Sequence, residues 1–104
     1  MEQKNTQWFV YIVRCSDETY YTGITTNIDR RINEHNSTTK GAKYTRSRKP
    51  VELEEYKEFQ DRSSASKEEY RIKQLSRTNK EKLIGKWRVD RLREEYVQPK
   101  GTNK

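Results

Sequence analysis

Apolar residues gather in two short runs near the start of the chain, and both runs have the composition of β-strands. Residues 8–13 are nearly all β-branched or aromatic, which suits a strand that is covered on both faces. Residues 19–25 form a second run of this kind. The polar residues 15–18 between them are few enough for a hairpin turn. The pattern therefore predicts an antiparallel pair of strands.

The predicted hairpin brings two tyrosines to one face of the sheet. If the strands pair around Ser16, Tyr11 and Tyr21 lie directly opposite each other. Gly23 follows Tyr21 at the two-residue period of a strand, so it belongs to the same face. Because glycine has no side chain, we expect an opening at Gly23 beside the two phenols.

The next predicted element is a short helix over residues 28–35. Asn27 and the two threonines before it supply an N-cap, and Asp29 in the first turn suits the helix dipole. The two isoleucines of the segment form its inward stripe. Arg31 and His35 border that stripe, so we expect both side chains to reach toward the tyrosines.

The rest of the chain predicts one more strand and two more helices. Residues 51–59 alternate as a third strand, and residues 61–64 cap a helix over 65–75. A short helix over 80–85 follows. Residues 99–104 are expected to be a disordered tail. The apolar residues that can extend the last helix are Trp87, Val89 and Leu92.

Composition limits the size of the fold and indicates the partner. With 104 residues, of which 29% are hydrophobic and 38% charged, we expect a single domain with a thin core over 1–86. Residues 87–104 are then a helical extension and flexible tail. The net charge of +7 favours a polyanion such as nucleic acid. The alternative is a basic, soluble surface that has no partner.

Cysteine usage and hydropathy indicate where the protein works. Cys15 is the only cysteine of the sequence, which excludes a disulfide framework and a zinc site built from several cysteines. The sequence has neither an apolar run long enough for a membrane span nor a signal peptide at its start. We expect a cytoplasmic protein without a membrane partner; the sequence does not specify an oligomeric state.

A polar segment over residues 37–50 carries cations but no acids. Such a segment suits a phosphate backbone, and Tyr44 within it is a candidate for stacking on a base. The alternative is a solvated, flexible connection. The cations that we expect to contact nucleic acid are Lys40, Lys43, Arg46, Arg48 and Lys49.

Acidic residues offer two candidate metal sites. The glutamates of the third strand are more typical of solvated surface than of a metal site. On the helix over 65–75, Glu68 and Glu69 border opposite flanks of the apolar stripe, and periodicity does not choose between them. Glu69 also stands four residues before Lys73, and an ion pair between the two is the alternative to a metal ligand.

The residues in this order resemble the GIY-YIG nuclease domain, with similarity over about residues 7–86. The first motif is present as Phe9-Val10-Tyr11, which keeps the tyrosine but not the glycine, and the second as Tyr21-Thr22-Gly23. Arg31 and His35 follow at the family's helix spacing. The resemblance also selects Glu69, because the family carries its metal-binding glutamate four residues after a small residue, here Ala65. Ile24 departs from the pattern, since some family nucleases have a basic residue there.

The resemblance implies a fold and a chemistry. The fold is α+β, with a small three-stranded sheet flanked by helices in the order ββαβαα. Glu69 would hold one Mg²⁺ or Mn²⁺ ion, and Arg31 would grip the scissile phosphate. Tyr11 or Tyr21 would act as general base, and His35 would bond a tyrosine or assist proton transfer.

These expectations predict a metal-dependent endonuclease that hydrolyses nucleic-acid phosphodiesters, with DNA as the expected substrate. The first alternative is a nucleic-acid-binding module whose nuclease site is weak or inactive. The second is a domain that uses its charged surface to bind an acidic protein. Binding to phosphates weakens steeply as salt rises, which separates the first two hypotheses from a partner that contains no nucleic acid.

Overall fold

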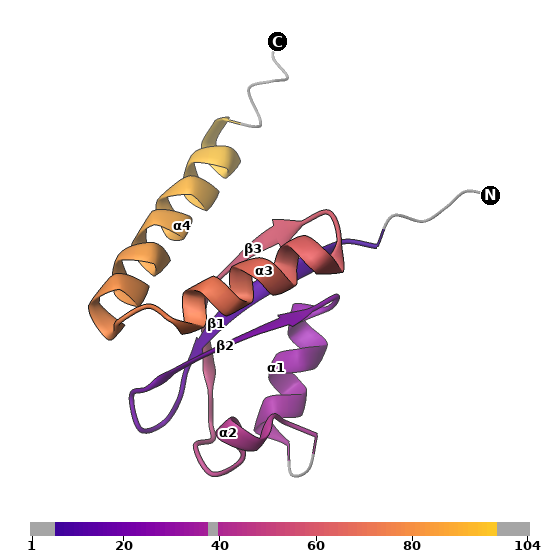
Figure 1. Ribbon diagram of the computed structural model, residues 1–104, viewed down its shortest axis with the longest axis vertical. Helices are drawn as coiled ribbons and strands as arrows, with labels where there is room; N and C mark the ends of the chain where they lie inside the picture. The colour runs from indigo at the N-terminus through magenta and orange to yellow at the C-terminus, as the bar shows by residue number, and fades with distance from the viewer. Residues whose placement is uncertain (1–5, 38–39, 98–104) are drawn as a thin grey trace, which may run out of the picture.

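The computed structural model describes residues 6–37 and 40–97 of the chain (Figure 1). Seven elements follow one another in these residues. The strands are β1 (Trp8–Arg14), β2 (Tyr20–Thr25) and β3 (Glu52–Phe59). The helices are α1 (Ile28–Asn36), α2 (Lys43–Arg46), α3 (Arg62–Lys73) and α4 (Arg77–Val97).

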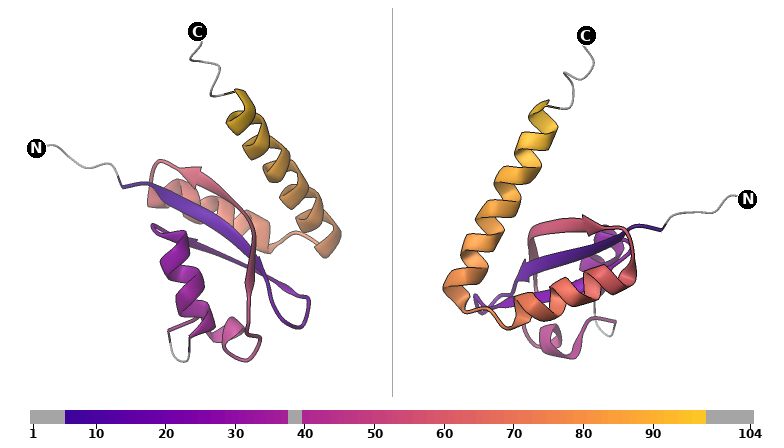
Figure 2. Two further views of the ribbon diagram at one scale, coloured as in Figure 1. Left: turned by 180° about the vertical axis from the view of Figure 1, so that it is seen from behind. Right: turned by 45° about the horizontal axis from the view of Figure 1, so that its top comes forward.

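The three strands form one antiparallel sheet in the order β2-β1-β3. Alternate residues of the central strand β1 face opposite layers. Val10 and Ile12 pack with α3 and α4, while Tyr11 and Val13 face the side of α1. The two views of Figure 2 show α3 and α1 on these opposite sides of the sheet. The predicted α+β fold with the order ββαβαα is confirmed, with the four-residue helix α2 inserted before β3.

The predicted register of the hairpin is wrong by two residues, which keeps the same side chains on the same face. Tyr11 lies opposite Gly23, and Tyr21 lies opposite Val13. The turn is longer than expected: the Cys15 N–H donates to the Thr19 carbonyl at 2.8 Å, and Glu18 adopts a positive φ of 70°. The two tyrosines are therefore diagonal neighbours on one face, with ring centroids 6.4 Å apart.

The opening expected at Gly23 is filled by the protein itself. A Cβ atom at this position would lie 2.5 Å from the Tyr11 Oη and 2.7 Å from its Cζ. The Tyr11 ring thus lies directly over the glycine, and both residues are buried. Gly23 admits the ring of Tyr11 rather than a ligand, so its predicted contact with nucleic acid is not supported by the geometry.

Helices α3 and α4 cover the other face of the sheet. Asp61 caps α3 by accepting from the Ser64 N–H, and Ala65 and Ile72 are buried as predicted. The short helix expected over 80–85 is part of the 21-residue α4, which passes the expected domain boundary at residue 86 without a break. Trp87, at 4% exposure, belongs to the core. The predicted tail, 99–104, lies outside the described residues.

One strand glutamate is not the solvated residue that the sequence predicts. Glu55 of β3 is 2% exposed and receives three hydrogen bonds from two arginines of α4. Arg91 reaches both carboxylate oxygens at 3.0 and 2.7 Å, and Arg88 donates at 3.1 Å. The Arg91 contact, opposed by burial, holds the pKa of Glu55 below its ordinary range. This cluster fastens the middle of α4 to the sheet.

Thr22 carries a buried hydroxyl that has no hydrogen-bond partner among residues 6–37 and 40–97. Because an isosteric apolar group removes this desolvation cost, Thr22→Val is expected to raise the free energy of unfolding by about 1 kcal/mol. Thr25→Val is the matched control on the same strand, since the Thr25 hydroxyl bonds Asn27 twice and its loss should destabilise the fold. Urea unfolding measures both variants; destabilisation by Thr22→Val would contradict the structure.

Candidate active site

The predicted site residues come from β1, β2, α1 and α3 and meet at the β2 edge of the sheet. The rings of Tyr11 and Tyr21 form the floor of the site, which we call the tyrosine floor. His35 of α1 contacts both rings edge-on, at centroid distances of 5.7 and 5.3 Å. From α3, Lys73 places its Nζ 5.5 Å from the Tyr21 ring centroid. The helices on the two faces of the sheet therefore converge at its edge strand.

A chain of hydrogen bonds fixes the tautomer of His35. The Thr45 hydroxyl donates to the Ala42 carbonyl at 3.0 Å, so it is an acceptor toward His35 Nδ1 at 2.8 Å. His35 then carries its proton on Nδ1, and Nε2 accepts from the Tyr11 hydroxyl at 2.7 Å. Tyr11 is the donor at the start of this chain, and its orientation is set by a buried neutral imidazole.

Burial acts on the protons of both groups in this chain. His35 is fully buried, and burial, with the nearby Arg31 charge, lowers its pKa to about 4. Burial and then Tyr21 raise the pKa of the Tyr11 phenol well above its ordinary value, against smaller opposing effects of Arg31. At neutral pH the chain therefore consists of an uncharged phenol and an uncharged imidazole.

The two tyrosines differ in their access to solvent. Tyr11 is 1% exposed, whereas Tyr21 is partly exposed at the sheet edge. Tyr21 stacks on Tyr44 with a centroid distance of 6.0 Å and an interplanar angle of 20°. Of the two candidate general bases, Tyr21 is the phenol that a water molecule or substrate can approach.

Arg31 stands beside this floor on α1. Its Nη1 donates to Glu34 at 2.8 Å and to the Lys40 carbonyl at 2.9 Å. Arg30 forms a longer ion pair with the same glutamate, at 3.7 Å, so Glu34 pairs with both guanidinium groups. The guanidinium of Arg31 also lowers the pKa of Tyr11, which places it within electrostatic range of the phenol.

The structure separates the two glutamates of α3. Glu69 pairs with Lys73 at 3.2 Å, on the flank that faces Tyr21, and its carboxylate contributes to raising the pKa of Tyr11. Glu68 pairs instead with Arg71 at 2.7 Å, and its pKa also responds to Lys57 of β3. Glu69 is thus the α3 acid that shares the site with the tyrosines, and it is also the partner of Lys73.

The donor set fits only a weakly held, hard cation. Among the described residues no three His, Cys, Asp or Glu side chains gather as a metal-binding group. Glu69 is partly exposed, with its side chain at 22%, so its carboxylate is open to solvent. Mg²⁺ commonly binds through one or two carboxylates, with water and substrate phosphates completing its shell. A single carboxylate beside a phosphate site is compatible with this mode.

The predicted nucleic-acid contacts divide into two groups. Tyr44 stacks on Tyr21, carries Arg48 at 3.9 Å from its ring centroid, and donates to Thr19 at 2.9 Å. A base would have to displace these groups, so Tyr44 and Arg48 instead fix α2 to the hairpin. Lys49 donates to the Ser37 carbonyl. Of the cations predicted to contact nucleic acid, the exposed ones whose side chains have no bonded partner among residues 6–37 and 40–97 are Lys40, Lys43 and Arg46.

Sequence reasoning missed Thr45, which is fully buried and holds the His35 ring. The segment around it was expected to be a polar loop, and the four-residue helix α2 has no apolar periodicity to predict it. A threonine in a polar run carries no signal of its own. Only the fold brings it within bonding distance of a histidine ten residues away.

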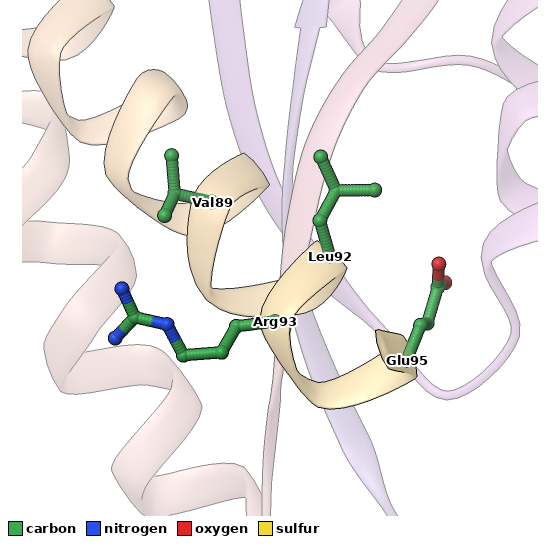
Figure 3. Close-up of a pocket in the computed structure, with 4 residues that line it drawn as sticks. All are labelled: Val89, Leu92, Arg93 and Glu95. Atoms are coloured by element: carbon green, nitrogen blue, oxygen red, sulfur yellow. The ribbon is translucent and has the colours of Figure 1, made fainter. Parts of the chain in front are cut away.

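A separate apolar hollow lies on α4 and contains none of these groups. It has a volume of about 500 Å³. Figure 3 shows the residues that line it, Val89, Leu92, Arg93 and Glu95. Val89 and Leu92, in the second half of α4, are each 52% exposed and are therefore not part of the core. The lining combines one exposed acid, Glu95, with neither a tyrosine nor a histidine, so this hollow is not a candidate active site. None of the helices within the described residues has the length and apolar character of a membrane span.

Comparisons with known proteins agree with this geometry. The family model described as the GIY-YIG catalytic domain matches residues 7–82. The UPF0213 protein DP2720 of Desulfotalea psychrophila is 66% identical over 77 residues, which cover 74% of this chain and 70% of that protein. UPF0213 protein VNG_2274C of Halobacterium salinarum is 57% identical over 75 residues, which cover 72% and 96%.

Solved structures show the same similarity. The solution structure of protein EF2693 from E. faecalis has a TM-score of 0.58 and 41% identity, and covers 86% of this chain and 93% of that one. The UPF0213 protein BH0048 from Bacillus halodurans has a TM-score of 0.50 and 47% identity, with coverage of 76% and 83%. The chain therefore belongs to the GIY-YIG catalytic domain family and is related to the UPF0213 proteins within it.

Proposed function

We propose that this protein is a metal-dependent endonuclease that hydrolyses nucleic-acid phosphodiesters, with DNA as its substrate. The observation that supports the proposal is the placement of Lys73, the ion-pair partner of Glu69 on α3, against the ring of Tyr21. The neighbouring Tyr11 lies within the electrostatic influence of Arg31. A purely structural role does not require a carboxylate, a guanidinium and an accessible phenol at one edge. Membership of the GIY-YIG family and the net charge of +7 support a polyanionic substrate.

Each residue of the site has a role in this proposal. Arg31 binds the scissile phosphate and neutralises charge on its oxygens. Tyr21 is the general base that accepts a proton from the attacking water, and the Lys73 ammonium lies 5.5 Å from its ring centroid. The water oxygen bonds to phosphorus, the P–O ester bond breaks, and the leaving oxygen takes a proton from solvent. Tyr11 and His35 position Tyr21 through ring contacts rather than meeting solvent themselves.

Glu69 would hold the single Mg²⁺ or Mn²⁺ ion, with waters completing its shell. A metal ion held there would supply electrostatic stabilisation of the charge that develops on the reacting phosphate. The exposed cations Lys40, Lys43 and Arg46 would bind the phosphate backbone beside the cleavage site. A cytoplasmic location stays a prediction, and DNA repair is the process that we propose for this activity.

Cleavage of nicked, branched and duplex DNA, with Mg²⁺ and with a chelator, tests the proposal. We expect Mg²⁺-dependent cleavage that falls by about a hundredfold in Glu69→Gln, because the ligand charge is lost. Glu68→Gln is the matched control, since Glu68 lies on the other flank of α3 and should leave cleavage unchanged.

Two other results would contradict the proposal. Salt-sensitive DNA binding without cleavage of any substrate would support a binding module with an inactive site. Binding to an acidic protein, without affinity for nucleic acid, would support a protein-interaction domain.

A further inference from the structure

Helix α3 carries two acid–cation pairs that look equivalent in sequence but differ in surroundings. Glu68–Arg71 projects from one flank, with the Arg71 side chain 54% exposed. Glu69–Lys73 projects from the other flank, with a Nζ–Oε2 distance of 3.2 Å. Of these two pairs, the second also contacts the candidate active site, because the Lys73 ammonium lies 5.5 Å from the Tyr21 ring centroid.

The location of the Lys73 ammonium has a chemical consequence. A cation that contacts a carboxylate at this distance occupies space that a metal ion bound to the same oxygen would need. Two like charges this close also repel, and the repulsion is larger beside a protein surface than in bulk water. A divalent ion therefore cannot bind Oε2 of Glu69, alone or together with the second carboxylate oxygen, until the ammonium has moved.

The Lys73 ammonium can leave Glu69 at a small cost in free energy. Ion pairs between residues four apart on an exposed helix are weak, and the Lys73 side chain is 45% exposed. Lysine has a long, flexible stem, so the ammonium can leave Glu69 by side-chain rotation alone. The electron-rich face of Tyr21 offers it an alternative contact at the same site.

We propose that Lys73 is a built-in competitor for the divalent cation at Glu69, which makes it a positioning residue that sets the metal concentration at which the site loads. This inference rests on the proposed function, since it takes Glu69 as the metal ligand. At low metal concentration the ammonium neutralises Glu69. When the metal binds, the ammonium moves toward Tyr21 and toward any phosphate bound there, where its charge is useful to the reaction.

Mn²⁺ binding to the full chain, followed by electron paramagnetic resonance of the free ion, tests this inference without a cleavage assay. Lys73→Met is expected to bind Mn²⁺ about tenfold more tightly than the unsubstituted protein, because the competing charge is removed. The gain should vanish in the double variant Lys73→Met, Glu69→Gln. Arg71→Met is the matched control: it removes the same charge from the same helix and should change the affinity by less than about twofold.

The outcomes separate this inference from the proposed function. If the unsubstituted protein binds Mn²⁺ through Glu69 but Lys73→Met has the same or weaker affinity, Lys73 is not a competitor and the metal site still stands. If neither the protein nor Lys73→Met binds Mn²⁺, both the metal site and the competitor are wrong. Binding that is detectable only in Lys73→Met would support the competitor most strongly.

Discussion

Replacement of Gly23 by alanine is expected to disrupt both the fold and the site. The new Cβ would lie 2.5 Å from the Tyr11 Oη, and the ring cannot yield freely because its hydroxyl is bonded to the buried His35 at 2.7 Å. Overpacking of this kind costs about 1–3 kcal/mol, and here it also breaks a buried hydrogen bond. We expect a lower free energy of unfolding in urea, together with loss of the cleavage activity proposed above.

Gly85→Ala is the matched control for this variant. Gly85 lies in α4, and a Cβ there would meet no atom within 4 Å. Alanine is favoured over glycine inside a helix, so this substitution should stabilise the protein by about 1 kcal/mol. If Gly23→Ala were as stable as the unsubstituted protein and kept the Tyr11–His35 hydrogen bond, the packing described for the tyrosine floor would be wrong.

Acidification is expected to destabilise the protein through His35. In the folded protein its pKa is lowered to about 4, whereas an unfolded histidine titrates near its ordinary value of 6.5. Between these two values the unfolded chain binds a proton that the folded chain does not, so stability falls as pH falls through this window. The full effect is about 3 kcal/mol, and above pH 6.5 the contribution no longer changes with pH.

His35 is the only histidine of the sequence, which makes its titration simple to follow. Proton NMR of the imidazole should show a neutral ring down to about pH 4. The urea-unfolding free energy, measured from pH 7 to pH 4, should fall more steeply for the unsubstituted protein than for His35→Phe, which lacks the titrating group. An imidazole that titrates near 6.5 in the folded protein would show that the ring is not held as described.

The strands and helices are predictable from the sequence because each has a local signal. Trp8 to Val13 is apolar and β-branched, and the polar caps at Asn27 and Asp61 begin the helices as the side chains predict. The register of the hairpin is not predictable in the same way. It depends on a turn that uses Glu18 in a left-handed conformation, without the glycine or asparagine that normally signals one.

Long-range polar contacts account for the other differences. The alternating pattern of β3 predicts that its glutamates are exposed to solvent. Glu55 is instead buried, because α4 packs against β3 and places Arg91 beside it. Helix α4 begins at Arg77, before the expected start at residue 80, and continues through Trp87, as the apolar residues that can extend it predict. The placing of Glu69, Arg31 and the tyrosines at one edge was implied by the family resemblance, whereas periodicity left Glu68 and Glu69 equivalent.

The central claim is that Glu69 and the tyrosine floor form one metal-dependent site, and paramagnetic NMR with Mn²⁺ tests it without knowledge of the substrate. A bound Mn²⁺ ion broadens signals of nearby nuclei. We predict broadening of the Tyr11, Tyr21 and His35 ring signals that disappears in Glu69→Gln, while the methyl signals of Val89 and Leu92 on the far part of α4 stay sharp. Broadening that spares the tyrosine rings, or that persists in Glu69→Gln, would contradict the claim.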